Sequence, residues 1–270
     1  MAQGNFDNGA ADYAKTAAHV TRRIAEAALK RIPPLKPGSC VLDLACGNGE
    51  VTSLVIESAI SAGHRPLPKV LGMDIAEGMV KLYQEKADSN KWGTVSSKVQ
   101  DAQNLQGVPD EHFDLVFMNF GIMFVPNGVS CTREVHRVLK TGGLAVFTTW
   151  KYGGVPHLVG RATEAVGAPR FRLPTDNGWD TKEKLVSTVH GGGFAPEDTQ
   201  VVIEQTCFER GNADGIVEAL GAPFWNPLHD GTLEAKLRWQ KALRESLTPT
   251  EEASGSVDMI SWVCLAKKNQ

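Results

Sequence analysis

Small residues recur at every second position in one stretch, where they could bring a ligand against the backbone. Val41–Glu50 reads VLDLACGNGE, so a short apolar run ends at Asp43, and Val51–Ile60 continues as a predicted helix. The small residues are Ala45, Gly47 and Gly49. Small side chains permit close backbone approach, and a helix N-terminus offers free N–H groups with a partial positive charge. The pattern predicts a strand, a ligand-binding turn and a helix.

Two further acids stand where predicted strands end. Asp74 follows the apolar run Val70–Met73, and Asp101 follows Val95–Gln100. A carboxylate at Asp74 could accept hydrogen bonds from both ribose hydroxyls of a nucleotide, although it could equally cap the helix that follows. Asp101 could accept from an adenine amine while the Ala102 N–H faces a ring nitrogen, the alternative being a turn carboxylate. Together the three acids favour a nucleotide ligand.

The elements that must position these acids form an alternating pattern. Five predicted strands alternate with helical segments between residues 40 and 150, which predicts a parallel sheet with right-handed crossovers. The strands are Cys40–Leu44, Val70–Met73, Val95–Gln100, Phe113–Asn119 and Leu144–Thr149. Ligands of such sheets bind beyond the carboxyl ends of the strands, where Asn119 and Trp150 also fall. Lys140–Gly143 is expected to end the preceding helix, with its glycines as the cap.

The segments on either side of this core complete a single predicted domain, residues 1–270. Residues 1–39 are expected to form an N-terminal helical cover, with a loose arm before a helix over Tyr13–Leu29. Residues 40–150 are the predicted cofactor-binding core. Residues 151–270 form the substrate side, with a helical lid at 211–247 and a closing strand at 256–266.

The composition of the chain argues against several classes of function. The 270 residues are 42% hydrophobic and 22% charged, which suits one α/β domain. The net charge of −3 argues against nucleic acid as a partner. The first residues lack a signal-peptide pattern, and no run of about 18 apolar residues predicts a membrane span, so we expect a cytoplasmic protein. Five scattered cysteines without a C-x-x-C motif predict free thiols, and no metal site is expected.

Two nucleotide-binding classes compete for the glycine-rich turn. A dinucleotide fingerprint is G-x-G-x-x-G with an acid about 20 residues further on. Gly47 and Gly49 are followed by Val51 and Thr52, so the third glycine is absent. That absence counts against a nicotinamide dinucleotide and favours S-adenosylmethionine.

Longer strings carry a family resemblance. The chain contains DLACGNG, MDIAEGM, QDAQNL and FDLVFMNFGIMF, followed by EVHRVLKTGGLAVFTTW. Over Tyr13 to Trp150 it resembles class I S-adenosylmethionine-dependent methyltransferases, with Ala45 in place of the family's first glycine. Within them it is similar to the ubiquinone and menaquinone biosynthesis type and to small-molecule methyltransferases of fungal secondary metabolism. The resemblance implies a Rossmann-like, doubly wound, mostly parallel seven-stranded α/β sheet with an antiparallel final strand.

The resemblance also implies S-adenosylmethionine as cofactor, S-adenosylhomocysteine as product, and a set of binding residues. The set is Tyr13, Asp43, Ala45, Gly47, Asn48, Gly49, Asp74, Ile75, Met79, Asp101, Ala102, Asn119 and Phe120. Ile75 and Met79 would pack on the adenine, and Asn119 and Phe120 would present backbone to the amino-acid end and the sulfonium. Tyr13 would close over the carboxylate. For Met79 and Tyr13 the alternative is core packing.

Methyl transfer from a sulfonium is an in-line displacement, so a general base is needed only where the nucleophile must lose a proton. His157, just past the fifth strand, is the candidate base, the alternative being a solvent-facing helix histidine. His136 and His190 are interpreted as structural.

Aromatic residues gather in the segments predicted to border the crevice. The candidate substrate-side residues are Phe124, Trp150, Tyr152, Phe224, Trp225 and His229. Phe224 and Trp225 stand between two prolines, which suits contact with a flat or apolar acceptor, or with a protein.

The sequence therefore predicts methyl transfer from S-adenosylmethionine to a small, apolar or aromatic metabolite. One alternative is a protein of this fold that binds the cofactor without methylating, as a binding partner or as a guide for a cyclisation. The third interpretation is an NAD-dependent oxidoreductase, but this sequence lacks the third glycine of the dinucleotide-binding fingerprint.

Overall fold

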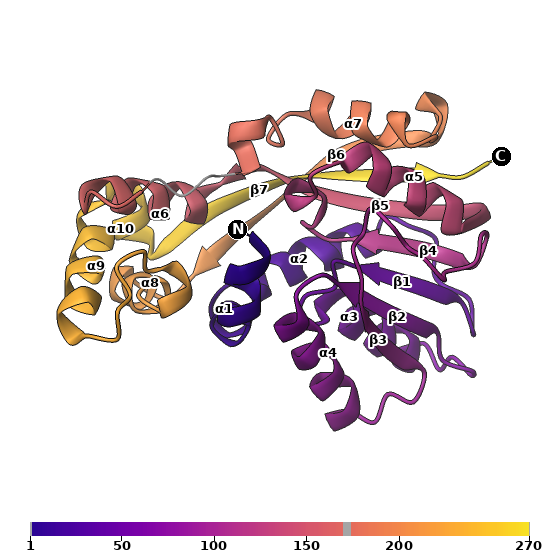
Figure 1. The fold of residues 1–270 in the computed structure, drawn as a ribbon, viewed down its shortest axis with the longest axis horizontal. Coiled ribbons are helices and arrows are strands. Elements are labelled where there is room, and N and C mark those ends of the chain that lie inside the picture. The colour runs from indigo at the N-terminus through magenta and orange to yellow at the C-terminus, as the bar shows by residue number, and fades with distance from the viewer. Residues whose placement is uncertain (1, 170–173, 270) are drawn as a thin grey trace.

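A seven-stranded sheet forms the centre of the molecule (Figure 1). The computed structural model describes residues 2–169 and 174–269. The strands are β1 (Cys40–Leu44), β2 (Lys69–Asp74), β3 (Val95–Val99), β4 (Phe113–Met118), β5 (Leu139–Gly153), β6 (Thr199–Glu209) and β7 (Ser256–Lys267). Their order is β3-β2-β1-β4-β5-β7-β6. The pairs from β3 to β5 are parallel and β7 is antiparallel to both neighbours, which confirms the predicted fold class.

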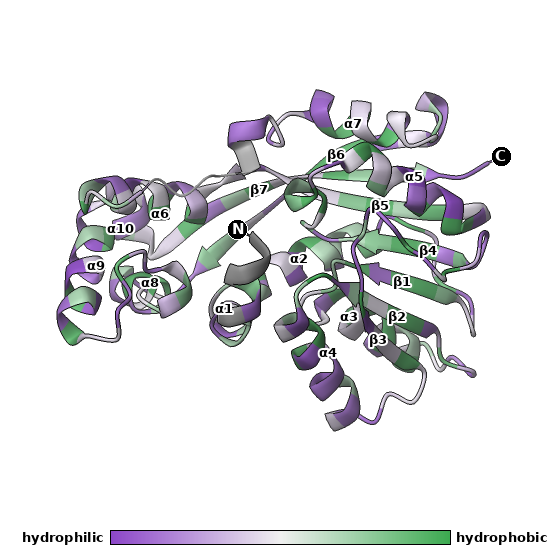
Figure 2. Cartoon of the chain, in the orientation of Figure 1, coloured by the Kyte–Doolittle hydropathy of each residue, from purple (hydrophilic) through white to green (hydrophobic). Residues whose placement is uncertain are grey.

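The helices of the core are α2 (Ala18–Leu29), α3 (Glu50–Ser61), α4 (Glu77–Ser89), α5 (Gly128–Val138) and α7 (Lys182–Gly191). Successive residues of β4, from Leu115 to Met118, are all buried, so the sheet is covered on both faces there. Figure 2 shows the same central strands as the most hydrophobic part of the chain. A short 3₁₀ turn, η1 (Ile122–Phe124), follows β4, and η3 (Pro196–Asp198) precedes β6.

A second core lies where β5, β6 and β7 extend beyond the other strands (Figure 1). It is built by α6 (Gly154–Ala165), α8 (Ala213–Leu220), α9 (Leu233–Glu245) and α10 (Pro249–Ser254). Trp239 is fully buried there, and its Nε1 donates to the Leu220 carbonyl oxygen at 2.9 Å. The segment expected to be a lid does lie between β6 and β7, and its helices share this core with α6.

The N-terminal segment differs from its expected form. Residues expected to be a loose arm form α1 (Ala2–Thr16), and Ala17 separates α1 from α2. α1 packs on α4 and on η4 (Pro223–Trp225), and two glycines permit the approach. A Cβ at Gly78 would come within 2.4 Å of the Asp7 carbonyl oxygen, and one at Gly9 within 2.4 Å of the Phe224 ring. Tertiary contacts with α4 and η4 therefore hold α1 in place, and its own sequence gives no local signal of them.

The predicted glycine cap at Lys140–Gly143 is wrong. α5 ends at Val138, and Leu139 already has extended backbone and belongs to β5. Gly142 has a φ of +83°, and its N–H donates to the Lys268 carbonyl oxygen at 2.6 Å. The glycines thus shape an irregular start of β5, where its register with β4 shifts.

Within the described residues no helix combines the length and apolar character needed to cross a membrane, and no group of three metal-ligating side chains gathers. The five cysteines are unpaired.

The second core generates a stability prediction. Trp239→Ala should lower the free energy of unfolding by about 3–5 kcal/mol, because a fully buried indole is removed. Leu237→Ala, on the same helix but 54% exposed, is the matched control and should stay within about 0.5 kcal/mol. Urea unfolding measures both; equal losses for the two variants would mean that this core is not packed as described.

Candidate active site

The turn between β1 and α3 has an unusual backbone. Ala45, Gly47 and Gly49 all have positive φ, at +55°, +52° and +81°, and Gly49 caps the N-terminus of α3. A Cβ on Gly49 would lie 2.9 Å from the Tyr83 ring, whereas one on Gly47 would meet nothing within 4 Å. The backbone at Gly47 therefore faces open space, as a ligand-binding turn requires.

Asp74 at the end of β2 holds this turn in place. Its Oδ2 accepts from the Gly47 N–H at 2.9 Å, and its Oδ1 accepts from the Ala76 N–H at 2.9 Å. Burial raises the pKa of Asp74, opposed by these backbone donors. The capping alternative for Asp74 is wrong, because the N-cap of α4 is Ala76 and no side chain caps that helix. Each oxygen of the Asp74 carboxylate keeps a second lone pair for a ligand. The adjacent Ile75 is 43% exposed, an apolar surface beside the carboxylate.

Asp43 is directed into the protein rather than toward the turn's open side. Its Oδ2 accepts from the Thr52 N–H at 3.1 Å and from the Thr52 hydroxyl at 2.7 Å, and that hydroxyl also bonds the Tyr83 hydroxyl. The carboxylate is 1% exposed, and burial raises its pKa to about 7. Asp43 therefore fixes the first turn of α3.

Glu50 organises the opposite side of the turn. Its carboxylate accepts from the Asn48 amide at 2.9 Å, from Lys86 of α4 at 2.9 Å and from Arg22 of α2 at 3.2 Å. The predicted binding residue Asn48 is thus buried and committed to Glu50. Sequence reasoning missed Glu50, although its place at the first turn of a helix is a recognisable signal.

Asp101 lies in the loop after β3, beside Ala102, which is 9% exposed. The Gln103 backbone N–H donates to Asp101 Oδ1 at 2.9 Å, and the Gln103 amide donates to both carboxylate oxygens. Gln103 Oε1 in turn accepts from the Asn127 N–H at 2.9 Å. Gln103, not recognised from the sequence, therefore connects this acid to the loop after β4.

The segment after β4 is held by a chain of hydrogen bonds. Phe120 has a φ of +56°, and its N–H donates to the Thr148 hydroxyl at 2.8 Å. That hydroxyl donates to Asn119 Oδ1 at 2.9 Å, while the Asn119 amide donates to the Thr21 carbonyl oxygen at 3.1 Å. The Phe120 ring stacks on Trp150, with centroids 3.8 Å apart. A left-handed non-glycine residue this firmly held is typical of functional sites.

Aromatic rings from three elements meet above this edge. Phe6 contacts Tyr13, Phe124 and Phe224 at 5.5, 5.7 and 5.6 Å between ring centroids. Phe224 also contacts Trp225, whose Nε1 donates to the Thr16 hydroxyl at 3.0 Å. Burial raises the pKa of Tyr13. The structure thus brings together Phe124, Phe224 and Tyr13, joined by Phe6, which sequence reasoning missed because it fell in the expected arm.

Three of the predicted site residues, Met79, His157 and His229, make their contacts with residues other than those of the Phe120–Trp150 stack. Met79 is buried with Ala10 and Ala76 in the contact between α1 and α4, which matches its core-packing alternative. His157 lies on α6, with its ring 5.1 Å from that of Tyr152. His229 is exposed in the loop after η4. Among the described residues, no hydrogen bond or ring contact joins either histidine to the Phe120–Trp150 stack.

The comparisons with known proteins agree with this geometry. Residues 42–147 match the family model described as a methyltransferase domain. This stretch runs from β1 to β5 and contains the glycine-rich turn, Asp74, Asp101 and Phe120. This matched stretch is a class I S-adenosylmethionine-dependent methyltransferase domain.

The known relatives match only part of this chain. It is 26% identical over 162 residues to Methyltransferase tpcH of Aspergillus fumigatus, covering 57% of this chain and 56% of that protein. It is 35% identical over 112 residues to a demethylmenaquinone methyltransferase of Alkalihalophilus pseudofirmus, covering 42% of this chain and 45% of that one. The chain thus spans about half the length of these relatives.

Among solved structures, the methyltransferase fold is shared with the [4+2]-cyclase SpnF. The TM-score is 0.57 at 18% identity, over 92% of this chain and 81% of that one. At this identity the likeness concerns the fold alone.

The buried Asp43 generates a pH prediction. Its pKa of about 7 lies above the unfolded value of about 3.9, so folding takes up a proton between these limits. The stability that this group adds is complete below about pH 4 and is lost as the pH rises through about 7.

Asp43→Asn keeps an oxygen acceptor for Thr52 but does not titrate. Between pH 5 and pH 8 the unfolding free energy of the variant, relative to the unsubstituted protein, should rise by about 2–3 kcal/mol. Urea unfolding at both pH values measures this change. A relative stability that does not vary with pH would show that Asp43 is not a buried, proton-binding carboxyl group.

Proposed function

We propose that the protein transfers a methyl group from S-adenosylmethionine to a small acceptor that is apolar or aromatic. The observation that supports this most is the arrangement at the carboxyl edge of the sheet. There an open, left-handed glycine turn, the Asp74 carboxylate and the Asp101–Ala102 loop stand on neighbouring strands β1, β2 and β3.

The residues present suit this cofactor. The open backbone at Gly47 and the N-terminus of α3 would receive the methionine part, while Asp74 would accept from the ribose hydroxyls. The exposed Ile75 would pack on the adenine. Asp101 would accept a hydrogen bond from the adenine amine, and the Ala102 N–H would face a ring nitrogen. Asn119 and Phe120 would present their backbone to the amino-acid end and the sulfonium. Asp43 and Asn48 would act indirectly, by fixing the turn.

The cofactor, when bound, supplies an activated methyl group on a good leaving group. What this chain must add is alignment and the exclusion of water. α1 lies along this edge and joins α4 to η4 through the rings of Phe6, Tyr13 and Phe224. We propose that α1 covers the cofactor and that the segment 211–247 closes over the acceptor. No proton transfer is assigned to His157, which contacts Tyr152 instead.

The same aromatic rings support the apolar or aromatic acceptor. Phe124 is 42% exposed, so part of its ring is available to a ligand, and Trp150 stacks on Phe120 beside the proposed sulfonium position. The demethylmenaquinone methyltransferase relative is named for a small molecule, which supports a small-molecule acceptor here too.

A second candidate function is cofactor binding without methyl transfer. The shared fold with a [4+2]-cyclase favours keeping it, because a fold does not fix the reaction. Formation of S-adenosylhomocysteine from S-adenosylmethionine with a panel of aromatic acceptors distinguishes the two. An NAD-dependent reaction is not supported, because buried Thr52 stands where the fingerprint's third glycine would be and binds Asp43.

The ribose role of Asp74 generates a binding prediction. The protein should bind S-adenosylhomocysteine at least about tenfold more tightly than its 2′,3′-dideoxy analogue, because two charge-assisted hydrogen bonds are lost. In Asp74→Ala this preference should nearly vanish, as measured by titration calorimetry. Using two ligands separates the ribose contact from the general loss of the Gly47 and Ala76 bonds.

Asp88→Ala, an exposed carboxylate on α4, is the control and should keep the full preference. A preference that survives in Asp74→Ala would leave Asp74 only its hydrogen bonds to the Gly47 and Ala76 N–H groups. Absence of S-adenosylmethionine binding at millimolar concentration would refute the proposed function itself.

A further inference from the structure

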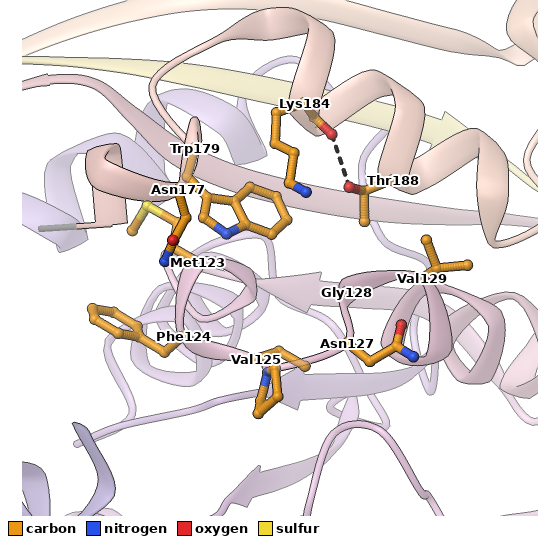
Figure 3. A pocket seen from close by; sticks show the side chains of 11 residues that line it. Met123, Phe124, Val125, Asn127, Gly128, Val129, Asn177, Trp179, Lys184 and Thr188 are labelled. Atoms are coloured by element: carbon orange, nitrogen blue, oxygen red, sulfur yellow. Dashed lines mark hydrogen bonds between the residues drawn. The ribbon is translucent and has the colours of Figure 1, made fainter. Parts of the chain in front are cut away.

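A cavity of about 600 Å³ lies between η1 and the start of α5 on one side and the start of α7 on the other (Figure 3). Its volume lies within the usual range for small-molecule sites. The lining residues that matter chemically are Phe124, Asn127, Asn177, Trp179 and Lys184. Asn177 ends the short turn η2 (Pro174–Asn177). None of the predicted cofactor residues lines this cavity, and Phe124 is the one predicted substrate residue that does.

The charge of this cavity is positive, although the whole chain carries a net charge of −3. Among the described residues the Lys184 ammonium makes no ion pair, and it lies 5.5 Å from the centre of the Trp179 ring. None of the described residues that line the cavity is acidic. An anionic ligand group would thus meet a cation that is not already neutralised.

Hydrogen-bond donors reinforce this preference. Asn127 Oδ1 accepts from the Ser130 N–H at 3.0 Å and caps α5, which leaves the NH₂ group of the amide as a donor. The Thr188 hydroxyl donates to the Lys184 carbonyl oxygen at 2.8 Å, so it is already used within α7. Figure 3 shows the Lys184 and Trp179 side chains directed toward the space above η1.

The walls of the cavity suit a flat ring. The Trp179 indole is 5% exposed and has the Lys184 ammonium over its ring, so its faces are already covered. Phe124 is 42% exposed and is the aromatic side chain that this cavity offers to a ligand. A half-exposed phenyl ring in the same cavity as the Lys184 ammonium and the Asn127 amide fits an aromatic ring that carries a carboxylate.

The cavity is joined to the proposed transfer site through η1. Met123 accepts through its sulfur from the Trp150 N–H at 3.5 Å, and Trp150 stacks on Phe120. Phe124 faces the cavity and also packs on Phe6 of α1. A ligand seated here therefore lies one short turn away from the residues proposed to face the sulfonium.

We infer that this cavity binds the carboxylate-bearing end of an aromatic acceptor, with Lys184 as the residue that selects the anion. The inference rests on the proposed function, because it assigns the cavity to the acceptor of that reaction.

The probes are 2-naphthoate and its neutral counterpart 2-naphthamide, titrated into the protein saturated with S-adenosylhomocysteine. The unsubstituted protein should bind 2-naphthoate at least about tenfold more tightly than the amide. Lys184→Met should abolish this preference, and Lys184→Arg should keep most of it. Lys182→Met removes the same charge from the same turn of α7, outside the cavity lining, and should keep the full preference.

Equal binding of the two probes by the unsubstituted protein, or no binding of 2-naphthoate, would overturn the inference. So would an equal effect of Lys182→Met and Lys184→Met, which would indicate only a long-range charge effect. S-adenosylhomocysteine affinity is measured for each variant and should not change. Failure of the cofactor to bind the unsubstituted protein would refute the proposed function instead, whatever the probes do.

Discussion

The arrangement of the whole edge depends on one half-buried carboxylate, that of Asp74. Asp74 receives the N–H groups of Gly47 and Ala76, and so joins the turn after β1 to the start of α4. Burial raises its pKa, and only correctly placed donors offset that cost. With the turn fixed, α3 begins at Glu50 and α4 presents the surface on which α1 lies. The turn after β1, Asp74 and the start of α4, which together form the cradle, therefore already have their binding geometry before any ligand binds.

The molecule has two hydrophobic cores, one around the central sheet and one built by α6, α8 and α9. α1 and η4 are in aromatic contact between them. At the boundary the Phe120–Trp150 stack and η1 lie between the proposed cofactor seat and the cavity that contains Lys184. The proposed cofactor seat and the proposed acceptor cavity thus belong to the same main core, which holds both in a fixed relation.

The strands and the acids at their ends could be predicted because apolar runs and strand-end acids are local signals. The correct form of α1 could not, because Phe6, Gly9 and Asp7 are ordered by contacts with Phe224 and α4, far along the chain. Glycines after α5 suggested a cap, but pairing with β4 and β7 draws this segment into β5. The cavity had no local signal, since Phe124 and Lys184 meet only through folding.

The central claim, that the cofactor occupies the cradle around Asp74, is tested most directly by titrating isotope-labelled protein with S-adenosylhomocysteine and following the backbone amide signals. The account predicts the largest shifts at Gly47, Ile75, Ala102 and Phe120, with little change in α9. Shifts confined to the second core, or none at saturating ligand, would contradict it.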